Sequence, residues 1–340
     1  MDAERPVVVV ANGFGDHLLV LPAMRALAAM FKDRLRLVCA PWAADTFFHS
    51  LPFGEVLVME KLRRSVAADG RTVIGHDFDA DPLIGKLIAA DLVMVLHPWF
   101  SPSLQQLLDG LAPARSIGFS PGYDESLATL CGQHWADRAF QVPRLLDPSL
   151  QIDDFAFAPE FAEESCRAAQ AVWRQIPTTM RVLVVHADTK NEKMWLAARF
   201  ARTIQRFLAY HPEFVVFVVG TSNTLRELCR FEARVIPCFG FDLATSMALV
   251  GRADLFLGID SCMLHAADLW RVPGVGLFGP SDPAEFGFRF APHRHVWADG
   301  AMTEIAEHQV IDALESLHAA NGKTPRTRRP FGARSTPHSS

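Results

Sequence analysis

Short runs of β-branched residues alternate with helical patterns along most of this 340-residue chain. In its first part, four apolar runs predict buried parallel strands at residues 7–10, 35–39, 55–59 and 92–96. Between the first two runs, apolar residues recur at three- and four-residue steps and indicate a helix: Leu18, Leu19, Leu27, Ala28 and Phe31. Pro22 within this stretch is expected to kink the helix or to mark its first turn.

The alternation stops between Pro143 and Pro177, where prolines surround one helix-like segment at residues 160–175. It then restarts. Strands are predicted at residues 182–186, 214–219, 234–237, 255–259 and 275–278. Helices are predicted at residues 197–208, 222–230, 243–251, 263–270 and 305–317.

Two successive β/α series predict an α/β protein with two doubly wound, Rossmann-like domains that face a cleft. We expect the first domain at residues 1–150, a connection at 151–177 and the second domain at 178–320. Residues 321–340 are rich in proline, serine and arginine, and we expect this tail to be disordered.

Composition and charge indicate a globular protein without a nucleic-acid-binding surface. Half of the residues are hydrophobic and 21% are charged, as in a globular chain with a sizeable core. The net charge is −5, but five basic residues and no acidic ones lie in the tail. The rest of the chain has 28 basic and 38 acidic residues, so it offers no broad basic surface for nucleic acid.

The start of the chain and its cysteines predict a cytoplasmic protein. The first residues are charged and the apolar run after them is short, unlike a signal peptide. The sequence contains no stretch of about eighteen consecutive apolar residues, so it predicts no membrane-spanning helix. The six cysteines are scattered without a Cys-x-x-Cys pair, which indicates free thiols rather than disulfides or a zinc site.

A glycine-rich turn follows the first strand. Gly13, Gly15 and Asp16 stand where the strand ends and the helix begins, so a ligand could approach the backbone closely. An NAD-dependent oxidoreductase is one interpretation, but Leu18 stands where the dinucleotide fingerprint needs a small residue. The simplest alternative for Asp16 is a helix cap that satisfies free backbone amides.

Polar residues also follow the first strand of the second series. Thr189 and Lys193 lie in one loop, and a hydroxyl with an ammonium group suits a diphosphate. A solvated polar loop is an equally good interpretation of this segment taken alone.

A second loop of this kind follows the strand at residues 255–259. Asp260, Ser261 and Cys262 open a helix whose amides could hold the negative charge of a leaving group. His265 lies in the first turn of that helix, although a buried core histidine is the usual explanation for such a residue. A Gly-Pro-Ser-Asp-Pro turn at residues 279–283 follows the next strand.

Together these segments resemble the bacterial ADP-heptose:lipopolysaccharide heptosyltransferases of glycosyltransferase family 9, which have the two-domain GT-B fold. The similarity spans about residues 7 to 300, and its motifs occur in the family's order. The matching segments are Gly15-Asp16 with Leu21-Pro22-Ala23, His186-Ala187 with Thr189 to Lys193 and Trp195, Asp260-Ser261 with His265, and residues 279–283. Residues 115–119 also resemble a strand of the family's first domain.

The resemblance implies an inverting glycosyltransferase of the EC 2.4 class, with a role for each matching residue. Asp16 matches the family's general base, and the donor diphosphate would contact Thr189 and Lys193. Asp260, Ser261, Cys262 and His265 match the donor-site motif. The family usually has glycine at the position of Cys262, and often a small hydroxyl residue or glycine at that of Asp188.

The resemblance also implies the partners: ADP-heptose as donor, a glycan or glycolipid acceptor of lipopolysaccharide core synthesis, and no cofactor or metal. Residues 77–81 carry three aspartates, which we interpret as a solvated turn rather than a metal site. Besides Gly13 and Gly15, the acceptor could contact Lys61, Arg63 and Arg64, and the basic tail could contact the inner face of the cytoplasmic membrane. Two alternatives stay open: a relative that modifies a protein or small molecule, and an inactive nucleotide-sugar-binding protein.

Overall fold

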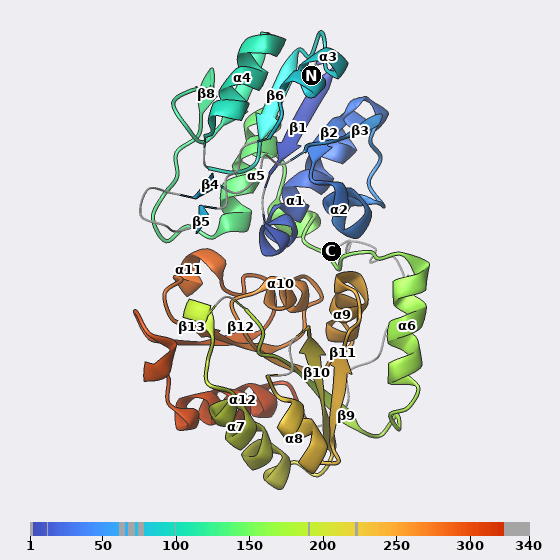
Figure 1. The fold of residues 1–340 in the computed structure, drawn as a ribbon, viewed down its shortest axis with the longest axis vertical. Coiled ribbons are helices and arrows are strands. Elements are labelled where there is room, and N and C mark those ends of the chain that lie inside the picture. The colour runs from blue at the N-terminus through green and yellow to red at the C-terminus, as the bar shows by residue number, and fades with distance from the viewer. Residues whose placement is uncertain are drawn as a thin grey trace. The chain divides into compact units, whose positions relative to one another are not determined.

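The fold is taken from a computed structural model, which describes residues 3–11, 13–60, 65–66, 72–73, 78–98, 100–189, 191–221 and 224–322. The chain divides into two compact units, Met1–Phe155 and Ala156–Ser340. Each unit contains a six-stranded sheet in which all neighbouring strands are parallel. The predicted α/β class with two doubly wound sheets is therefore confirmed (Figure 1).

The sheet of the first unit has the strand order β3-β2-β1-β6-β7-β8. Its strands are β1 (Pro6–Val10), β2 (Arg36–Cys39), β3 (Glu55–Val58), β6 (Leu92–Val95), β7 (Arg115–Gly118) and β8 (Glu125–Ser126). Its helices are α1 (Phe14–Phe31), α2 (Pro41–Ala43), α3 (Asp81–Lys86), α4 (Pro102–Leu111) and α5 (Trp135–Leu146). A two-stranded antiparallel ribbon, β4 (Ser65–Val66) and β5 (Thr72–Val73), stands apart from this sheet.

Helix α1 is the central core helix of the first unit. It packs against α5, and most of its residues are buried. Pro22 lies inside α1, so of the two predicted alternatives the first-turn position is excluded. By length and composition alone the segment Phe14–Arg34 could cross a membrane, but 72% of the tested window is buried inside the protein, as expected of a core helix.

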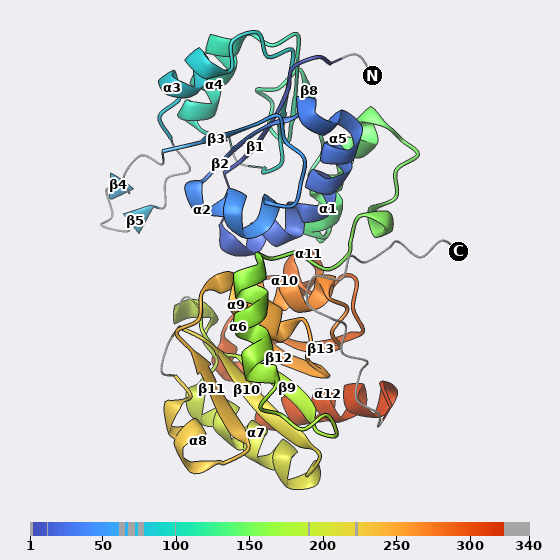
Figure 2. The same cartoon turned by 90° about the vertical axis from the view of Figure 1, so that its right-hand side faces the viewer.

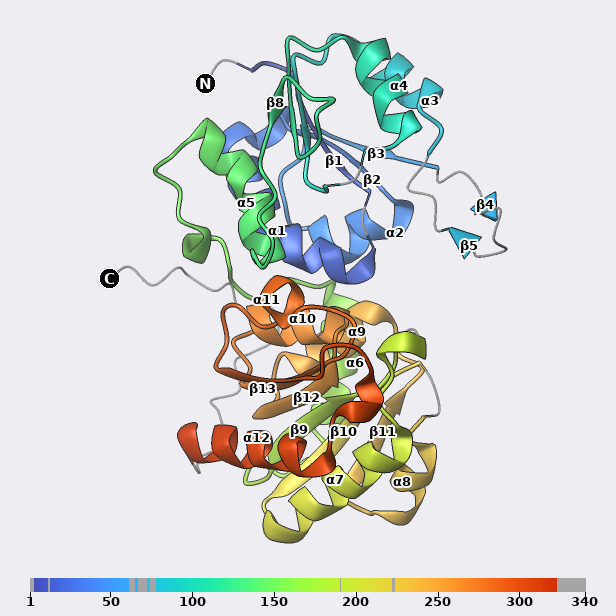
Figure 3. The ribbon, with the colours of Figure 1, turned by 90° about the vertical axis from the view of Figure 1, so that its left-hand side faces the viewer.

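The sheet of the second unit has the order β11-β10-β9-β12-β13-β14. Its strands are β9 (Arg181–His186), β10 (Phe214–Gly220), β11 (Val235–Phe239), β12 (Leu255–Ile259), β13 (Gly274–Phe278) and β14 (His293–Trp297). Its helices are α6 (Glu163–Trp173), α7 (Ala197–Tyr210), α8 (Arg226–Phe231), α9 (Leu243–Val250), α10 (Cys262–Leu269), α11 (Pro283–Phe286) and α12 (Glu307–Ala320). Figures 2 and 3 show α7, α8 and α12 on one face of the sheet and α6, α9 and α10 on the other.

Most predicted elements of the second unit are confirmed to within two residues. The helix predicted at 222–230 is shorter, because α8 begins only at Arg226, and α12 begins at Glu307 rather than at residue 305. The helix-like segment at 160–175 is α6, which packs against α9 as part of the second unit. Of the aspartates at 77–81, Asp79 is exposed and Asp81 begins α3, while residue 77 lies outside the described residues.

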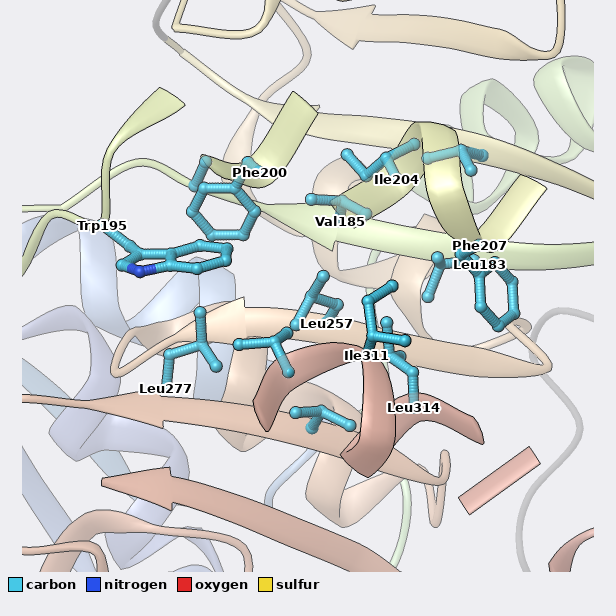
Figure 4. Close-up of a cluster of buried hydrophobic side chains, with 14 of the residues drawn as sticks. Leu183, Val185, Trp195, Phe200, Ile204, Phe207, Leu257, Leu277, Ile311 and Leu314 are labelled. Carbon is cyan, nitrogen blue, oxygen red and sulfur yellow. The ribbon is translucent and has the colours of Figure 1, made fainter. Parts of the chain in front are cut away.

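A buried cluster on the α7–α12 face of this sheet anchors the loop after β9 (Figure 4). Trp195 is fully buried, and its ring meets that of Phe200 edge to face at 4.9 Å. The indole Nε1 of Trp195 donates a hydrogen bond to the carbonyl oxygen of Ile305 at 3.1 Å. Lys193 lies two residues before Trp195, so this packing fixes the end of the loop that carries it.

Two histidines meet where the strands of the second sheet begin. The Nε2 of His211 donates a hydrogen bond to the carboxylate of Glu315 at 2.9 Å, and the Nη1 of Arg181 donates to the Nδ1 of His318 at 3.0 Å. Glu213 lies 3.4 Å from the Nδ1 of His211 and 3.8 Å from the Nε2 of His318. Burial, and then the charges of Arg181 and His211, lower the pKa of His318.

The lowered pKa of His318 predicts a loss of stability in mild acid. The unfolded chain takes up a proton near pH 6.5, about the ordinary value for histidine, whereas the folded chain resists it. The free energy of unfolding should therefore fall as the pH drops through about 6.5. Burial lowers the pKa of His186 as well, and His186 should contribute in the same direction.

Denaturant unfolding at several pH values measures this dependence. His318→Gln keeps an acceptor for Arg181 but does not titrate, so its slope of stability against pH should be shallower than that of the wild type. Equal slopes for the two proteins would contradict the role of His318.

Candidate functional site

Two of the donor-site residues predicted in the second unit, Lys193 and His265, lie beside the buried carboxylate of a third, Asp260. Asp260 follows β12, and the Nζ of Lys193 forms an ion pair with its Oδ2. The hydroxyl of Ser281 donates to the same oxygen at 2.8 Å, and the Nε2 of His265 lies 3.9 Å from Oδ1. The side chain of Asp260 is only 7% exposed, while that of Lys193 is 29% exposed. Because the side chain of Lys193 is partly exposed, its ammonium group can also form an ion pair with an anion that binds there.

The topology explains why these residues meet. Strands β9 and β12 are neighbours at the centre of the sheet, where the strand order reverses. Ligands of open α/β sheets bind at the carboxyl ends of the strands that flank such a switch point. Lys193, in the short helix η4 (Asn191–Lys193), follows β9, and Asp260 follows β12, so the two side chains come from both flanks of this point.

The start of α10 supplies backbone donors next to Asp260. Ser261 is the N-cap residue, and its carbonyl oxygen accepts the amides of Leu264 and His265 at 3.1 and 3.4 Å. The first amides of a helix have no acceptor within it, so those of Cys262 and Met263 are suited to an anion. Burial raises the pKa of the Cys262 thiol to about 12, so this side chain is a neutral neighbour rather than a nucleophile.

The loop after β9 also carries Thr189 and Asp188, and both are part-buried. The Oδ2 of Asp188 accepts the amide of Thr221 at 2.8 Å. Gly220 has φ +153°, and a Cβ there would lie 2.1 Å from this oxygen, so the approach requires glycine. Asp188 therefore joins the loop to the end of β10.

Asp16 in the first unit is the third residue of α1, and its side chain caps the backbone amide of the N-cap residue Gly13. It lies in the first turn of α1, and its Oδ2 accepts the amide of Gly13 at 3.0 Å. The Nδ1 of His17 contacts the carbonyl oxygen of Gly13 at 2.5 Å, so the two side chains hold Gly13 from both sides. Gly15 is part-buried in the same turn. This geometry fixes the direction of the Asp16 carboxylate and is compatible with a base as well as with a cap.

Ser281 was not among the site residues predicted from the sequence. The turn at 279–283 was recognised, but its position beside Asp260 depends on the pairing of β12 with β13. Lys61, Arg63, Arg64 and the tail from 323 onwards lie outside the described residues, so their predicted roles stay predictions.

Among the described residues, one group has the composition of a metal site. Ligand atoms of His211, Glu213 and His318 lie within 4.8 Å of one another. However, Arg181 donates to the Nδ1 of His318, and a neutral imidazole with this nitrogen occupied must carry its proton on Nε2. That nitrogen then has no lone pair for a metal, so the arrangement fits a hydrogen-bonded ion cluster better.

Comparisons with known proteins agree with this fold. The crystal structure of a glycosyltransferase family 9 protein from Veillonella parvula DSM 2008 is similar with a TM-score of 0.75 at 21% identity, over 93% of this chain and 97% of that one. The heptosyltransferase WaaC of E. coli with ADP gives 0.67 at 18% identity, over 92% of this chain and 100% of that one. The E. coli ADP-heptose lipopolysaccharide heptosyltransferase II gives 0.66 at 15% identity, over 92% and 98%.

These similarities show a GT-B-like fold, as predicted. A comparison with curated protein sequences gives no match. The model of glycosyltransferase family 9 (heptosyltransferase) matches residues 127–310, which is more than half of the chain and includes Lys193, Asp260 and His265. The chain therefore belongs to glycosyltransferase family 9 and is a heptosyltransferase-like glycosyltransferase.

Proposed function

We propose that this protein transfers a sugar, with inversion, from a nucleoside diphosphate donor to an acceptor hydroxyl. The donor would be ADP-heptose and the acceptor a glycan of lipopolysaccharide core or related synthesis. The observation that carries the proposal is the cluster of Lys193, Asp260 and Ser281 at the switch point of the second sheet. Similar structures support the donor: one contains WaaC with ADP-2-deoxy-2-fluoro heptose, and one contains TibC with ADP-D-beta-D-heptose.

The second unit would bind the donor and stabilise its leaving group. When the glycosidic bond breaks, negative charge grows on the diphosphate oxygen that departs. The ammonium of Lys193 would turn from Asp260 to the diphosphate, and the amides of Cys262 and Met263 would donate to it. These groups supply positive charge without a metal, so metal-independent transfer is part of this proposal.

Asp16 would activate the acceptor. Its carboxylate would take the proton of the acceptor hydroxyl while that oxygen forms a bond to the anomeric carbon. The bond between this carbon and the diphosphate oxygen breaks on the opposite face, so the configuration inverts. The Gly13 amide, which donates to Oδ2, would keep the carboxylate oriented during the proton transfer.

Calorimetry with ADP, GDP and UDP, followed by mass spectrometry of products, tests this function. We expect ADP to bind most tightly, and ADP-heptose to modify a saccharide acceptor with equal yield in the presence of a chelator. Binding of ADP without transfer to any acceptor would indicate an inactive binding protein. If no nucleoside diphosphate binds, the donor-site assignment is wrong.

A further inference from the structure

Five aromatic rings form a continuous cluster in the first unit, beside the helix start that carries Asp16. His17, Phe47 and Phe48 form its buried end, with side chains at most 3% exposed. The ring of His17 lies 5.3 Å from that of Phe47 and 5.7 Å from that of Phe48. Trp42 joins the cluster edge to face, 4.8 Å from His17 and 6.2 Å from Phe47.

The backbone after β2 is built to present Trp42. Pro41 begins α2 with the φ angle that a helix requires, and Trp42 follows it directly. The chain then forms a π-helix at Ala44–Phe48, a rare geometry that occurs frequently at functional sites. This segment buries Phe47 and Phe48 next to each other and leaves Trp42 half-buried above them.

The other end of the cluster is open to solvent. Phe14, the first residue of α1, is 51% exposed, and its ring lies 4.2 Å from that of Trp42 with a tilt of 38°. We call this pair the aromatic shelf. Trp42 contacts the buried rings of His17 and Phe47, and these contacts restrict its movement. Asp16 stands two residues after Phe14, in the same helical turn.

We propose that the aromatic shelf of Phe14 and Trp42 binds one face of a pyranose ring of the acceptor, at the start of the helix that carries Asp16. This proposal rests on the proposed function and names a specificity-determining site within it. The C–H bonds on one face of a pyranose carry partial positive charge and pack against the negative face of an aromatic ring. The hydroxyl groups at the edge of the pyranose remain available for hydrogen bonds to polar groups.

The shape of the shelf favours a sugar over a lipid chain. The Phe14 ring is 51% exposed and packs at 4.2 Å on the half-buried Trp42, so the exposed apolar surface is about one ring wide, whereas an acyl chain needs a longer apolar groove. The flanking Gly13, Pro41 and Asp45 are exposed, and Asp45 adds a second carboxylate close in sequence to Trp42. An apolar patch with a polar border matches a molecule with one apolar face and a polar edge.

Saturation-transfer NMR with methyl α-D-glucopyranoside, methyl α-D-mannopyranoside and butyl β-D-glucopyranoside tests the shelf. In the wild type we expect saturation on the protons of one ring face. Phe14→Ala and Trp42→Ala should weaken glycoside binding about tenfold, the scale of one lost ring stack. Trp42→Phe should restore most of the binding. Phe231→Ala, which removes an aromatic ring that is 77% exposed on α8, is the matched control and should bind as the wild type does.

The outcomes separate the shelf from the proposed function. ADP affinity should be the same in all variants, and thermal unfolding like that of the wild type shows that the first unit, which carries the shelf, still folds. If ADP binds but no glycoside gives saturation transfer, or the alanine variants bind glycosides as well as the wild type, the shelf proposal is wrong. Saturation of the butyl chain instead of the ring would show that a lipid binds there and would also overturn it. Loss of ADP binding in the wild type itself would instead overturn the proposed function.

Discussion

Replacing Asp16 with asparagine is expected to lower the rate of sugar transfer by about 10²–10⁴-fold, the usual contribution of a general base. Asparagine has the same shape and keeps an oxygen that can accept the Gly13 amide, so the start of α1 should persist. The residues proposed to bind the nucleotide lie in the other unit, so ADP affinity should stay unchanged. Turnover is measured from nucleotide release with acceptor present, and affinity by calorimetry.

Asp137→Asn is a suitable control for this variant. Asp137 is also an acidic residue in the first turn of a helix of the first unit, but that helix is α5. The Asp137→Asn variant should keep full transfer activity. If Asp16→Asn is as active as Asp137→Asn, then Asp16 acts only as a helix cap.

Replacing Lys193 with alanine is expected to weaken ADP binding by about 10–100-fold, since a charge-assisted contact contributes ~1.5–3 kcal/mol. The transfer rate should fall as well, because the same ammonium would stabilise the leaving diphosphate. The variant also leaves the buried carboxylate of Asp260 without its ion pair, so its thermal stability must be measured in parallel.

Lys86→Ala removes an exposed lysine from the last turn of α3 and serves as the control, with no expected change in ADP binding. His265→Ala should have a smaller effect than Lys193→Ala, because His265 lies 3.9 Å from Asp260 and its side chain is only 5% exposed, against 29% for Lys193. If Lys193→Ala binds ADP as tightly as the wild type, the assignment of the donor site to the second unit is wrong.

The strands were the most predictable part of the fold. A parallel strand covered on both faces needs an uninterrupted apolar run, and the runs at β1, β9 and β12 have this form. Helix ends were less predictable, as α8 shows, because propensity alone does not determine where packing ends a helix. Strand β14 was not predicted, because its histidines and arginine give it the pattern of a polar loop. It is a strand because it pairs with β13.

The candidate site was predictable as a set of loops but not as a set of contacts. The sequence indicated that Lys193 and Asp260 both follow strands. It did not indicate that they form an ion pair, since that depends on the neighbouring positions of β9 and β12. The aromatic shelf was missed because Phe14 and Trp42 are distant in sequence and each has an ordinary local context.

The strand order also has a consequence for biosynthesis. The central strand β1 lies between β2 and β6, and Pro6 pairs with Leu92. While the chain emerges from the ribosome, one edge of β1 therefore has no strand to pair with until β6 has been translated. Strand β9 is in the same position relative to β12, where Leu183 pairs with Leu255. Both strands are strongly apolar, and unpaired apolar edges associate readily, so a nascent chain of this topology passes through two separate intervals of its synthesis in which such an edge is open to association.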